Sequence, residues 1–119
     1  MEILEFTVGD KRFGIEVTMA EEIIRYIKVT PVLRSNKLIE GFIMYHGEPA
    51  AVIDMFKYAE CPEYKNDAAD MLICTDFCGH KVAFRVSLIL GIKNLASDNP
   101  DEALILPDYE EVIKLAQEY

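Results

Sequence analysis

The sequence predicts an all-β protein built from two copies of one unit, with a helix at its C-terminus. Three observations support this prediction. Short stretches of alternating apolar and polar residues occur in pairs around turn residues, one half of the chain can be aligned with the other, and the clearest helical periodicity lies at the C-terminus. Hydrophobic residues make up 51% of the 119 positions, which is enough for the core of one domain.

The first pair of strands is predicted at the N-terminus. Residues 3–8 and 12–17 alternate in polarity and contain β-branched and aromatic side chains, and Gly9-Asp10-Lys11 supplies the turn between them. After this hairpin, residues 19–24 favour one helical turn before the chain extends again. The N-terminal region is therefore expected to be a hairpin followed by a short helical connection.

A second hairpin is predicted over residues 39–54, with its turn near His46-Gly47-Glu48. Gly47 can adopt the positive φ angle that a tight turn requires. At the end of this hairpin, Asp54 is placed to accept hydrogen bonds from the backbone of a short helix over residues 55–58. A strand, a turn, a strand and a capped helical turn are thus expected in sequence.

A polar segment separates this hairpin from a third one. Residues 60–70 contain a proline and many polar side chains, and they are the best candidate for a linker. Residues 71–77 and 81–86 then predict two strands around Cys78-Gly79-His80. Beyond them, another loop is predicted at residues 97–101.

The last residues predict a helix that packs on the core. Asp108 is a suitable N-cap, and Glu111 three positions later can complete a capping box. Apolar side chains then follow at helical spacing and share one face of the helix: Tyr109, Val112, Ile113 and Ala116.

The N-terminal half of the chain can be aligned with the C-terminal half without a gap. Val8–Ile24 falls on Phe77–Lys93, and apolar residues meet apolar residues at almost every core-facing position. Further along, residues 51–55 resemble residues 105–109. Two copies of one β unit, each ending in a cap and a short helix, explain both matches. The central matching segments are Phe13-Gly14-Ile15-Glu16-Val17 and Val82-Ala83-Phe84-Arg85-Val86.

The second copy is shorter than the first. Val17 and Ala51 are 34 positions apart, whereas their counterparts Val86 and Ile105 are 19 apart, a difference of 15 (34 − 19). The missing stretch corresponds to the strand and turn at residues 41–48. A single domain is expected, and its parts are a first subdomain at about residues 1–59, a linker at about 60–70 and a shortened second subdomain at about 71–119.

Charge and hydropathy exclude several classes of function. The net charge is −9 and the isoelectric point is near 4.6, so nucleic acid is not an expected partner, because phosphate binding requires clustered basic residues. No stretch approaches the roughly 20 apolar residues of a membrane-spanning helix. The first residues, Met1 to Phe6, lack the basic start and long apolar run of a secretory signal, so a cytoplasmic location is expected.

Neither a catalytic site nor a metal site is expected. Cys74, Cys78 and His80 would share one face of a strand, but three soft ligands without a fourth fall short of a closed zinc site. The odd number of cysteines also argues against a disulfide framework. No nucleotide-binding or nucleophile motif occurs, and Asp54 has a capping role that explains it without catalysis. We therefore expect a protein without enzymatic activity, cofactor or metal.

Several short motifs, taken in order, resemble those of the CheW-like domain. Each motif is short, but their order and spacing together extend over nearly the whole chain. The matching segments are Phe13-Gly14-Ile15-Glu16-Val17, Ala20-Glu21-Glu22-Ile23, Gly41-Phe42-Ile43-Met44-Tyr45-His46-Gly47 and Ala51-Val52-Ile53-Asp54-Met55.

This resemblance implies a fold and a function. The family fold implies two small SH3-like β-barrels side by side, and proteins of this type act as adaptors that link chemoreceptor tips to the histidine kinase CheA. By the same resemblance, receptor contact would fall near the groove between the barrels and the remaining barrel surfaces would face the kinase. The residues implied in receptor contact are Ala20, Glu22, Gly41 and His46.

Two departures from the family pattern keep an alternative open. His46 stands where the family usually has an arginine, and a neutral imidazole offers neither the permanent charge nor the bidentate geometry of a guanidinium. The second subdomain is also shortened. The alternative is a diverged CheW-like module that binds proteins for a signalling regulator outside chemotaxis. For each implied contact residue, a purely structural role competes with partner binding.

Overall fold

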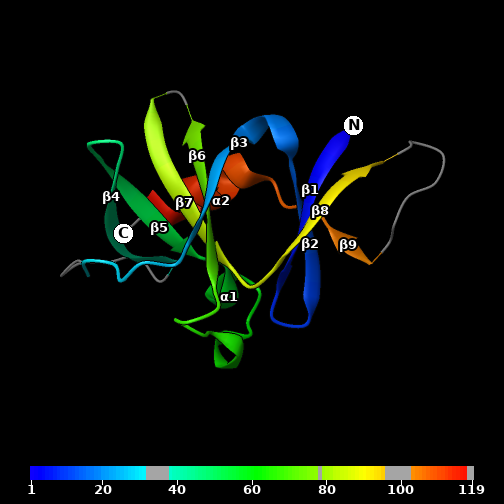
Figure 1. Cartoon of the computed structure of the whole chain (residues 1–119), viewed down its shortest axis with the longest axis horizontal. Helices are drawn as coiled ribbons and strands as arrows, with labels where there is room; N and C mark the ends of the chain where they lie inside the picture. Colours follow the sequence, from blue (N-terminus) through cyan, green and yellow to red (C-terminus); the bar gives the residue numbers. More distant parts are fainter. Residues whose placement is uncertain (32–37, 78, 96–102, 118–119) are drawn as a thin grey trace.

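The computed structural model describes residues 1–31, 38–77, 79–95 and 103–117, and it contains two β-sheets side by side (Figure 1). The four-stranded sheet has the order β8 (Ile89–Asn94), β1 (Glu2–Val8), β2 (Lys11–Glu16) and β9 (Leu104–Ile105). The five-stranded sheet has the order β3 (Ala20–Arg25), β6 (Met71–Phe77), β7 (His80–Val86), β5 (Glu48–Asp54) and β4 (Ile39–Tyr45). Two α-helices, α1 (Met55–Tyr58) and α2 (Tyr109–Gln117), and two 3₁₀ turns, η1 (Val17–Met19) and η2 (Pro62–Tyr64), complete the described elements.

The three predicted hairpins are present. β1 pairs with β2, β4 with β5, and β6 with β7, all antiparallel. In the second hairpin, His46 and Gly47 both have positive φ angles, 50° and 78°, as a tight two-residue turn requires. The mostly-β architecture in two parts with a C-terminal helix is therefore confirmed.

The helical turn predicted for residues 19–24 is wrong. The chain forms the 3₁₀ turn η1 over residues 17–19 and then the strand β3. Helix propensity in this short segment is outweighed by pairing with β6, in which Ile23 lies opposite Ile73 and Arg25 opposite Met71. Adjacent β-branched residues, Ile23 and Ile24, also favour the extended backbone.

The duplication is visible in the structure, and its two copies exchange strands. β1, β2 and β3 of the first copy begin 69 positions before β6, β7 and β8 of the second (71 − 2, 80 − 11 and 89 − 20). However, β3 pairs with β6 and β8 pairs with β1, so the third strand of each copy completes the sheet of the other. Each sheet therefore combines both copies, and the division into segments 1–59 and 71–119 stays a prediction.

The shortened second copy explains the different size of the two sheets. In the first copy, 23 positions separate the end of β3 from the start of β5 (48 − 25), and this stretch includes β4. In the second copy, only 10 positions separate the end of β8 from the start of β9 (104 − 94). Within the described residues the four-stranded sheet has no counterpart of β4, and β9 is one of its two edge strands. The loop predicted at residues 97–101 lies outside the residues that the structure describes.

The five-stranded sheet curls until its two edges are linked. An isolated antiparallel bridge joins Thr30, which follows β3, to Phe42 of β4, with reciprocal backbone hydrogen bonds of 2.9 Å. In the described part of the chain, no strand pairing joins β8 to β9, so the four-stranded sheet stays open. The five-stranded sheet is thus more nearly closed than the four-stranded sheet.

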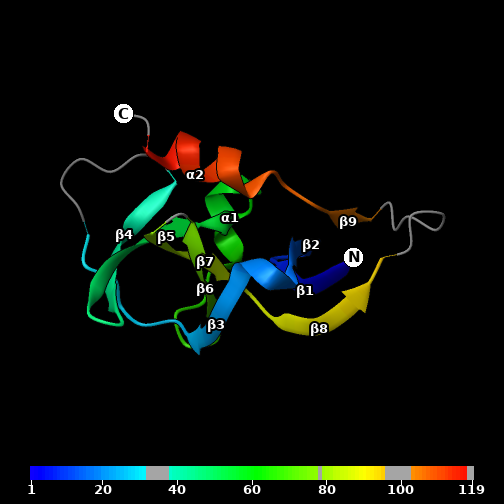
Figure 2. The ribbon, with the colours of Figure 1, turned by 90° about the horizontal axis from the view of Figure 1, so that it is seen from above.

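Both predicted helix caps are present, and α2 bridges the two sheets. The Asp54 carboxylate accepts hydrogen bonds from Phe56 and Lys57, and that of Asp108 accepts one of 3.3 Å from the backbone of Glu111. Figure 2 shows α2 lying across the top of the molecule above α1. Its first residue, Tyr109, donates a 2.8 Å hydrogen bond to the Gly14 carbonyl of the four-stranded sheet. The Tyr109 ring packs edge-on against Phe84 of the five-stranded sheet.

Candidate functional site

Two of the four residues implied in partner contact lie next to each other. Glu22 extends from β3 and His46 from the turn between β4 and β5, and their side chains approach to 3.6 Å between Oε2 and Nε2. These strands are the two outer strands of the five-stranded sheet, so the curl of the sheet brings the residues together. Both side chains are largely exposed, 46% for Glu22 and 65% for His46. This pair is available for contact with another protein.

The surroundings of this pair are charged, with exposed apolar side chains close by. Lys81 of β7 contacts the carboxylates of Glu21 at 3.3 Å and Asp76 at 2.9 Å, and its ammonium lies 5.8 Å from the centre of the Tyr45 ring. Beside His46, Met44 is 67% exposed. We call this the β3–β4 surface; its members are Glu21, Glu22, Ile23, Met44, His46, Asp76 and Lys81.

The other two implied residues differ from each other in position. Ala20 begins β3, is partly exposed and lies opposite Thr75, so it borders the β3–β4 surface. Gly41 is buried near the start of β4, five positions from His46, or about 17 Å along a strand. A Cβ atom on Gly41 would lie 2.3 Å from the Thr30 carbonyl oxygen. The space beside Gly41 is thus occupied by the backbone of the chain's own Thr30.

An ionic cluster that the sequence analysis did not identify surrounds Arg85 in β7. The Arg85 side chain is 3% exposed and donates hydrogen bonds to Asp70 at 2.9 Å, to Glu40 at 2.9 and 3.0 Å, and to Asp67 at 2.6 Å. Its guanidinium carbon also lies 3.7 Å from the centre of the Tyr26 ring. The sequence signal was a charged residue that follows an apolar run, residues 82–84, inside a predicted strand.

The Arg85 cluster joins segments that are distant in the sequence. Lys65 pairs with the buried carboxylate of Asp54 and lies 3.8 Å from Glu40. Residues 65–70, part of the presumed linker, are thereby fixed to β7 and to the start of β4. Because β4 leads directly to the turn that contains His46, the cluster positions one side of the β3–β4 surface.

The ionisation states in the cluster follow from burial and hydrogen bonding. Burial alone would lower the pKa of Arg85, but its hydrogen bonds to Asp67, Glu40 and Asp70 outweigh this effect and raise the pKa above its usual value. Burial, together with the hydrogen bond to Glu40, raises the pKa of Tyr26 to about 12. Arg85 is therefore a permanent cation and Tyr26 a neutral donor at physiological pH.

The residues of the cysteine–histidine motif differ in environment. Cys74 is buried in an apolar cluster, and burial raises the pKa of its thiol to about 11, whereas His80 is exposed. Cys78 lies outside the described residues. Among those that are described, no group of histidine, cysteine and acidic residues has the arrangement of a metal site. Nor does any described helix have the length and apolar character needed to cross a membrane.

Exposed apolar residues also line an edge strand, a feature that the sequence analysis missed. Leu88, just before β8, and Leu90 and Ile92 within it are 58%, 52% and 65% exposed. β8 pairs only with β1 among the described strands, and its register is broken by a bulge opposite Glu5 and Phe6. The alternating apolar residues Leu88, Leu90 and Ile92 would have suggested a side of the strand that is buried in the core. In the structure these side chains are exposed, and β8 lies at the edge of the smaller sheet.

Comparison with known proteins identifies the family. The family model of the CheW-like domain matches residues 2–117. Among solved structures, the scaffolding protein TtCheW from Thermoanaerobacter tengcongensis is similar, with a TM-score of 0.73 and 18% sequence identity. The match covers 82% of this chain and 63% of the other, so the chain spans less than two thirds of that protein's length. The structural match shows a shared fold, and the family model, which matches nearly the whole chain, shows that the chain belongs to the CheW-like domain family.

Proposed function

We propose that this chain is a non-catalytic cytoplasmic adaptor that couples chemoreceptors to a CheA-type histidine kinase. The observation that carries the proposal is the family match over residues 2–117, nearly the whole chain. An adaptor needs separate surfaces for its partners rather than a reactive centre. The β3–β4 surface and the apolar row on β8 (Leu88, Leu90 and Ile92) supply two such surfaces on different sheets.

The chemistry of the β3–β4 surface suits a helical receptor tip that carries apolar residues and charges of both signs. The carboxylates of Glu21 and Asp76 contact Lys81, that of Glu22 lies beside His46, and exposed Met44 offers a flexible apolar contact. Charged residues at the rim of an interface set specificity and association rate, while apolar anchors contribute most of the affinity. In this proposal Glu22 and His46 form the rim, and Ala20 borders it.

Isothermal titration calorimetry with two separate partners tests the proposal. The purified chain is titrated with the cytoplasmic tip of a chemoreceptor and, separately, with the regulatory domain of a CheA-type kinase from the same genome. We expect both to bind, and we expect Glu22→Lys to weaken receptor binding about tenfold through loss of charge complementarity. The matched control is Glu63→Lys, an exposed carboxylate in η2 outside the β3–β4 surface. Absence of binding to both partners would contradict the proposal.

A second candidate function rests on two specific observations. His46 replaces the arginine usual in the family, and among the described residues the four-stranded sheet has no strand that corresponds to β4. Both changes fit a CheW-like module that serves a signalling regulator outside chemotaxis. Under this alternative the same titrations give no receptor binding, while a β3–β4 variant such as Glu22→Lys still weakens binding to the other partner.

A further inference from the structure

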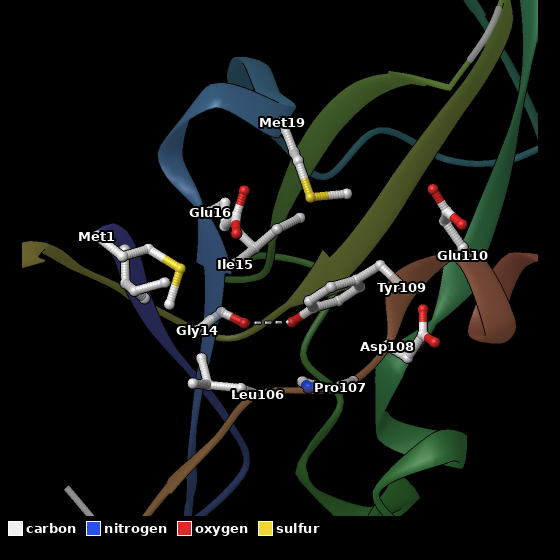
Figure 3. Close-up of a pocket in the computed structure, with 11 residues that line it drawn as sticks. Met1, Gly14, Ile15, Glu16, Met19, Leu106, Pro107, Asp108, Tyr109 and Glu110 are labelled. Carbon is white, nitrogen blue, oxygen red and sulfur yellow. Dashed lines mark hydrogen bonds between the residues drawn. The ribbon is translucent and has the colours of Figure 1, made fainter. Parts of the chain in front are cut away.

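A pocket of about 270 Å³ lies where the four-stranded sheet meets the start of α2 (Figure 3). Its walls are apolar and include Ile3, Ile15, Leu106 and two methionines, Met1 and Met19. Tyr109 also lines the pocket, and its hydroxyl group donates a hydrogen bond to the Gly14 carbonyl (Figure 3). Methionine side chains adapt their shape easily, so the pocket can accept a long side chain.

The rim of this pocket is acidic. Figure 3 shows Glu16 on one side of the pocket and Asp108 and Glu110 on the other. Among the described residues, no cationic side chain pairs with any of these three carboxylates. The Met1 ammonium is directed elsewhere, towards Asn94 Oδ1 and the Leu95 carbonyl, each at 3.4 Å. An apolar cavity with a negative rim matches the aliphatic stem and charged head of lysine or arginine.

The internal duplication shows how the equivalent place is filled in the other sheet. Glu16 corresponds to Arg85, which lies 69 positions later (16 + 69 = 85). Asp108 corresponds to Asp54, at an offset of 54 positions because the second copy is 15 positions shorter (69 − 15 = 54), and both aspartates cap a helix. In the five-stranded sheet, Arg85 lies opposite Asp54 and its guanidinium is held by three carboxylates. In the four-stranded sheet, carboxylates stand at both positions, and no described side chain supplies the cation.

Nor does the described part of the chain include a strand that covers this edge. In the five-stranded sheet, β4 pairs with β5, and Glu40 in β4 binds Arg85. β9 corresponds to β5 in position and register, since Ile105 lies opposite Phe13 as Ala51 lies opposite Val82. β9 has no described strand on its outer side, and Ile105 and Leu106 are 38% and 46% exposed. An unpaired edge beside a pocket is a common site for added strands.

We propose that an extended segment of a partner protein adds to the edge at β9 and inserts a lysine or arginine side chain into this pocket. The added segment would take the place that β4 has in the other sheet, and its cation would neutralise Glu16, Asp108 and Glu110. A second copy of the chain is the less suitable occupant, because two molecules of net charge −9 repel each other. The site lies on a different sheet from the β3–β4 surface, so it extends the proposed function and does not depend on it.

Peptide titration followed by NMR tests this inference on the whole chain. The probe is a short acetylated and amidated peptide of alternating threonine and valine with one central arginine, and its match has glutamine in place of arginine. We expect the arginine peptide to shift the amide signals of Gly14 and Glu16 and to bind about tenfold more tightly than the glutamine peptide. Equal binding of the two peptides, or no binding of either, would overturn the inference.

Two variants locate the binding. Glu16→Lys should reduce affinity for the arginine peptide about tenfold. Glu16→Arg should have the same effect, because it places in the pocket the residue type that Arg85 supplies at the equivalent position of the five-stranded sheet. The control is Glu48→Lys, an exposed carboxylate on the five-stranded sheet, which should leave affinity unchanged. Glu16 is exposed, so both variants should fold, as checked by melting temperature. Unchanged affinity in the two Glu16 variants would place the peptide elsewhere and overturn the inference.

Light scattering tests whether a second copy of the chain occupies the site instead. Dimers that form with increasing concentration, and that Glu16→Lys abolishes, would identify a second copy as the occupant and overturn the choice of partner.

Discussion

Arg85 Nε donates a 2.9 Å hydrogen bond to Asp70 Oδ2, and both side chains are almost completely buried, with 3% and 2% of their surface exposed. Asp70 ends the segment that resembles a linker in the sequence, and its backbone carbonyl also accepts a hydrogen bond of 3.0 Å from Tyr26. This pair therefore joins β7, the segment before β6 and the segment after β3. The start of β4 is held by the same arginine through Glu40.

Replacement of Arg85 should destabilise the protein strongly. Arg85→Met keeps much of the side-chain volume but leaves the buried Asp70 carboxylate without its cation, and loss of one partner of a buried ion pair typically costs about 3–5 kcal/mol. The measurement is the free energy of unfolding in urea. Asp67→Asn is the control, because the Asp67 side chain is 84% exposed and its pairing should contribute less than about 1 kcal/mol. A loss below about 1 kcal/mol for Arg85→Met would show that the cluster does not hold the fold.

Tyr26 should make stability fall at alkaline pH. Its pKa is raised from 10.0 to about 12 in the folded protein, first by burial and then by its hydrogen bond to Glu40. The folded state therefore retains a proton that the unfolded state loses, so this contribution is complete below pH 10 and diminishes as the pH rises towards 12. The difference in melting temperature between the wild type and Tyr26→Phe should be largest below pH 10 and should narrow above it. A constant or widening difference would contradict the assignment.

Gly41 should tolerate no side chain. In Gly41→Ala the new Cβ atom would lie 2.3 Å from the Thr30 carbonyl oxygen, so the bridge between Thr30 and Phe42 must open or shift. We expect a loss of stability of about 1–3 kcal/mol, typical of overpacking. At Gly47 no atom lies within 4 Å of the added Cβ, and only the positive φ opposes it, so Gly47→Ala should cost about 1 kcal/mol or less. Thermal unfolding of both variants measures these losses of stability. Equal losses in Gly41→Ala and Gly47→Ala would mean that the contact with Thr30 does not determine the cost at Gly41.

His46→Arg should strengthen binding to a standard receptor tip. The substitution restores the family's usual residue beside Glu22 and adds a permanent charge with two parallel donors. A well-formed charge-assisted hydrogen bond contributes roughly 1.5–3 kcal/mol, so an increase in affinity of about tenfold or more is expected. Calorimetry with the receptor tip measures this change. Unchanged or weaker binding would favour the alternative in which the chain has diverged to a regulator outside chemotaxis.

The sequence predicted local structure well because each signal is local. Alternation, turn glycines and cap residues are properties of a few neighbouring positions, and the hairpins and both caps follow from them. The helical turn at residues 19–24 failed for the opposite reason, since β3 exists through its pairing with β6, about 50 positions away (71 − 20 = 51). The duplication was also found, but alternation does not say which strands pair, so the exchange of β3 and β8 between the copies could not be foreseen.

The candidate site was predicted only in part. Glu22 and His46 were named separately on the basis of family resemblance, and their proximity arises from the curl of the five-stranded sheet. The Arg85 cluster was missed because its members come from four distant segments, and nothing in a single strand marks them as partners. The acidic pocket was missed for the same reason, although the alignment of Glu16 with Arg85 was already present in the sequence.

The central claim, that the chain joins a receptor to a kinase, is tested most directly by co-sedimentation. Membrane vesicles that carry the chemoreceptor are incubated with the CheA-type kinase from the same genome, with and without this chain, and the kinase in the pellet is measured. The account predicts that the kinase sediments with the receptor only when the chain is present, and that Glu22→Lys removes this effect while Glu63→Lys does not. Kinase that sediments equally without the chain, or that stays in solution with it, would contradict the account.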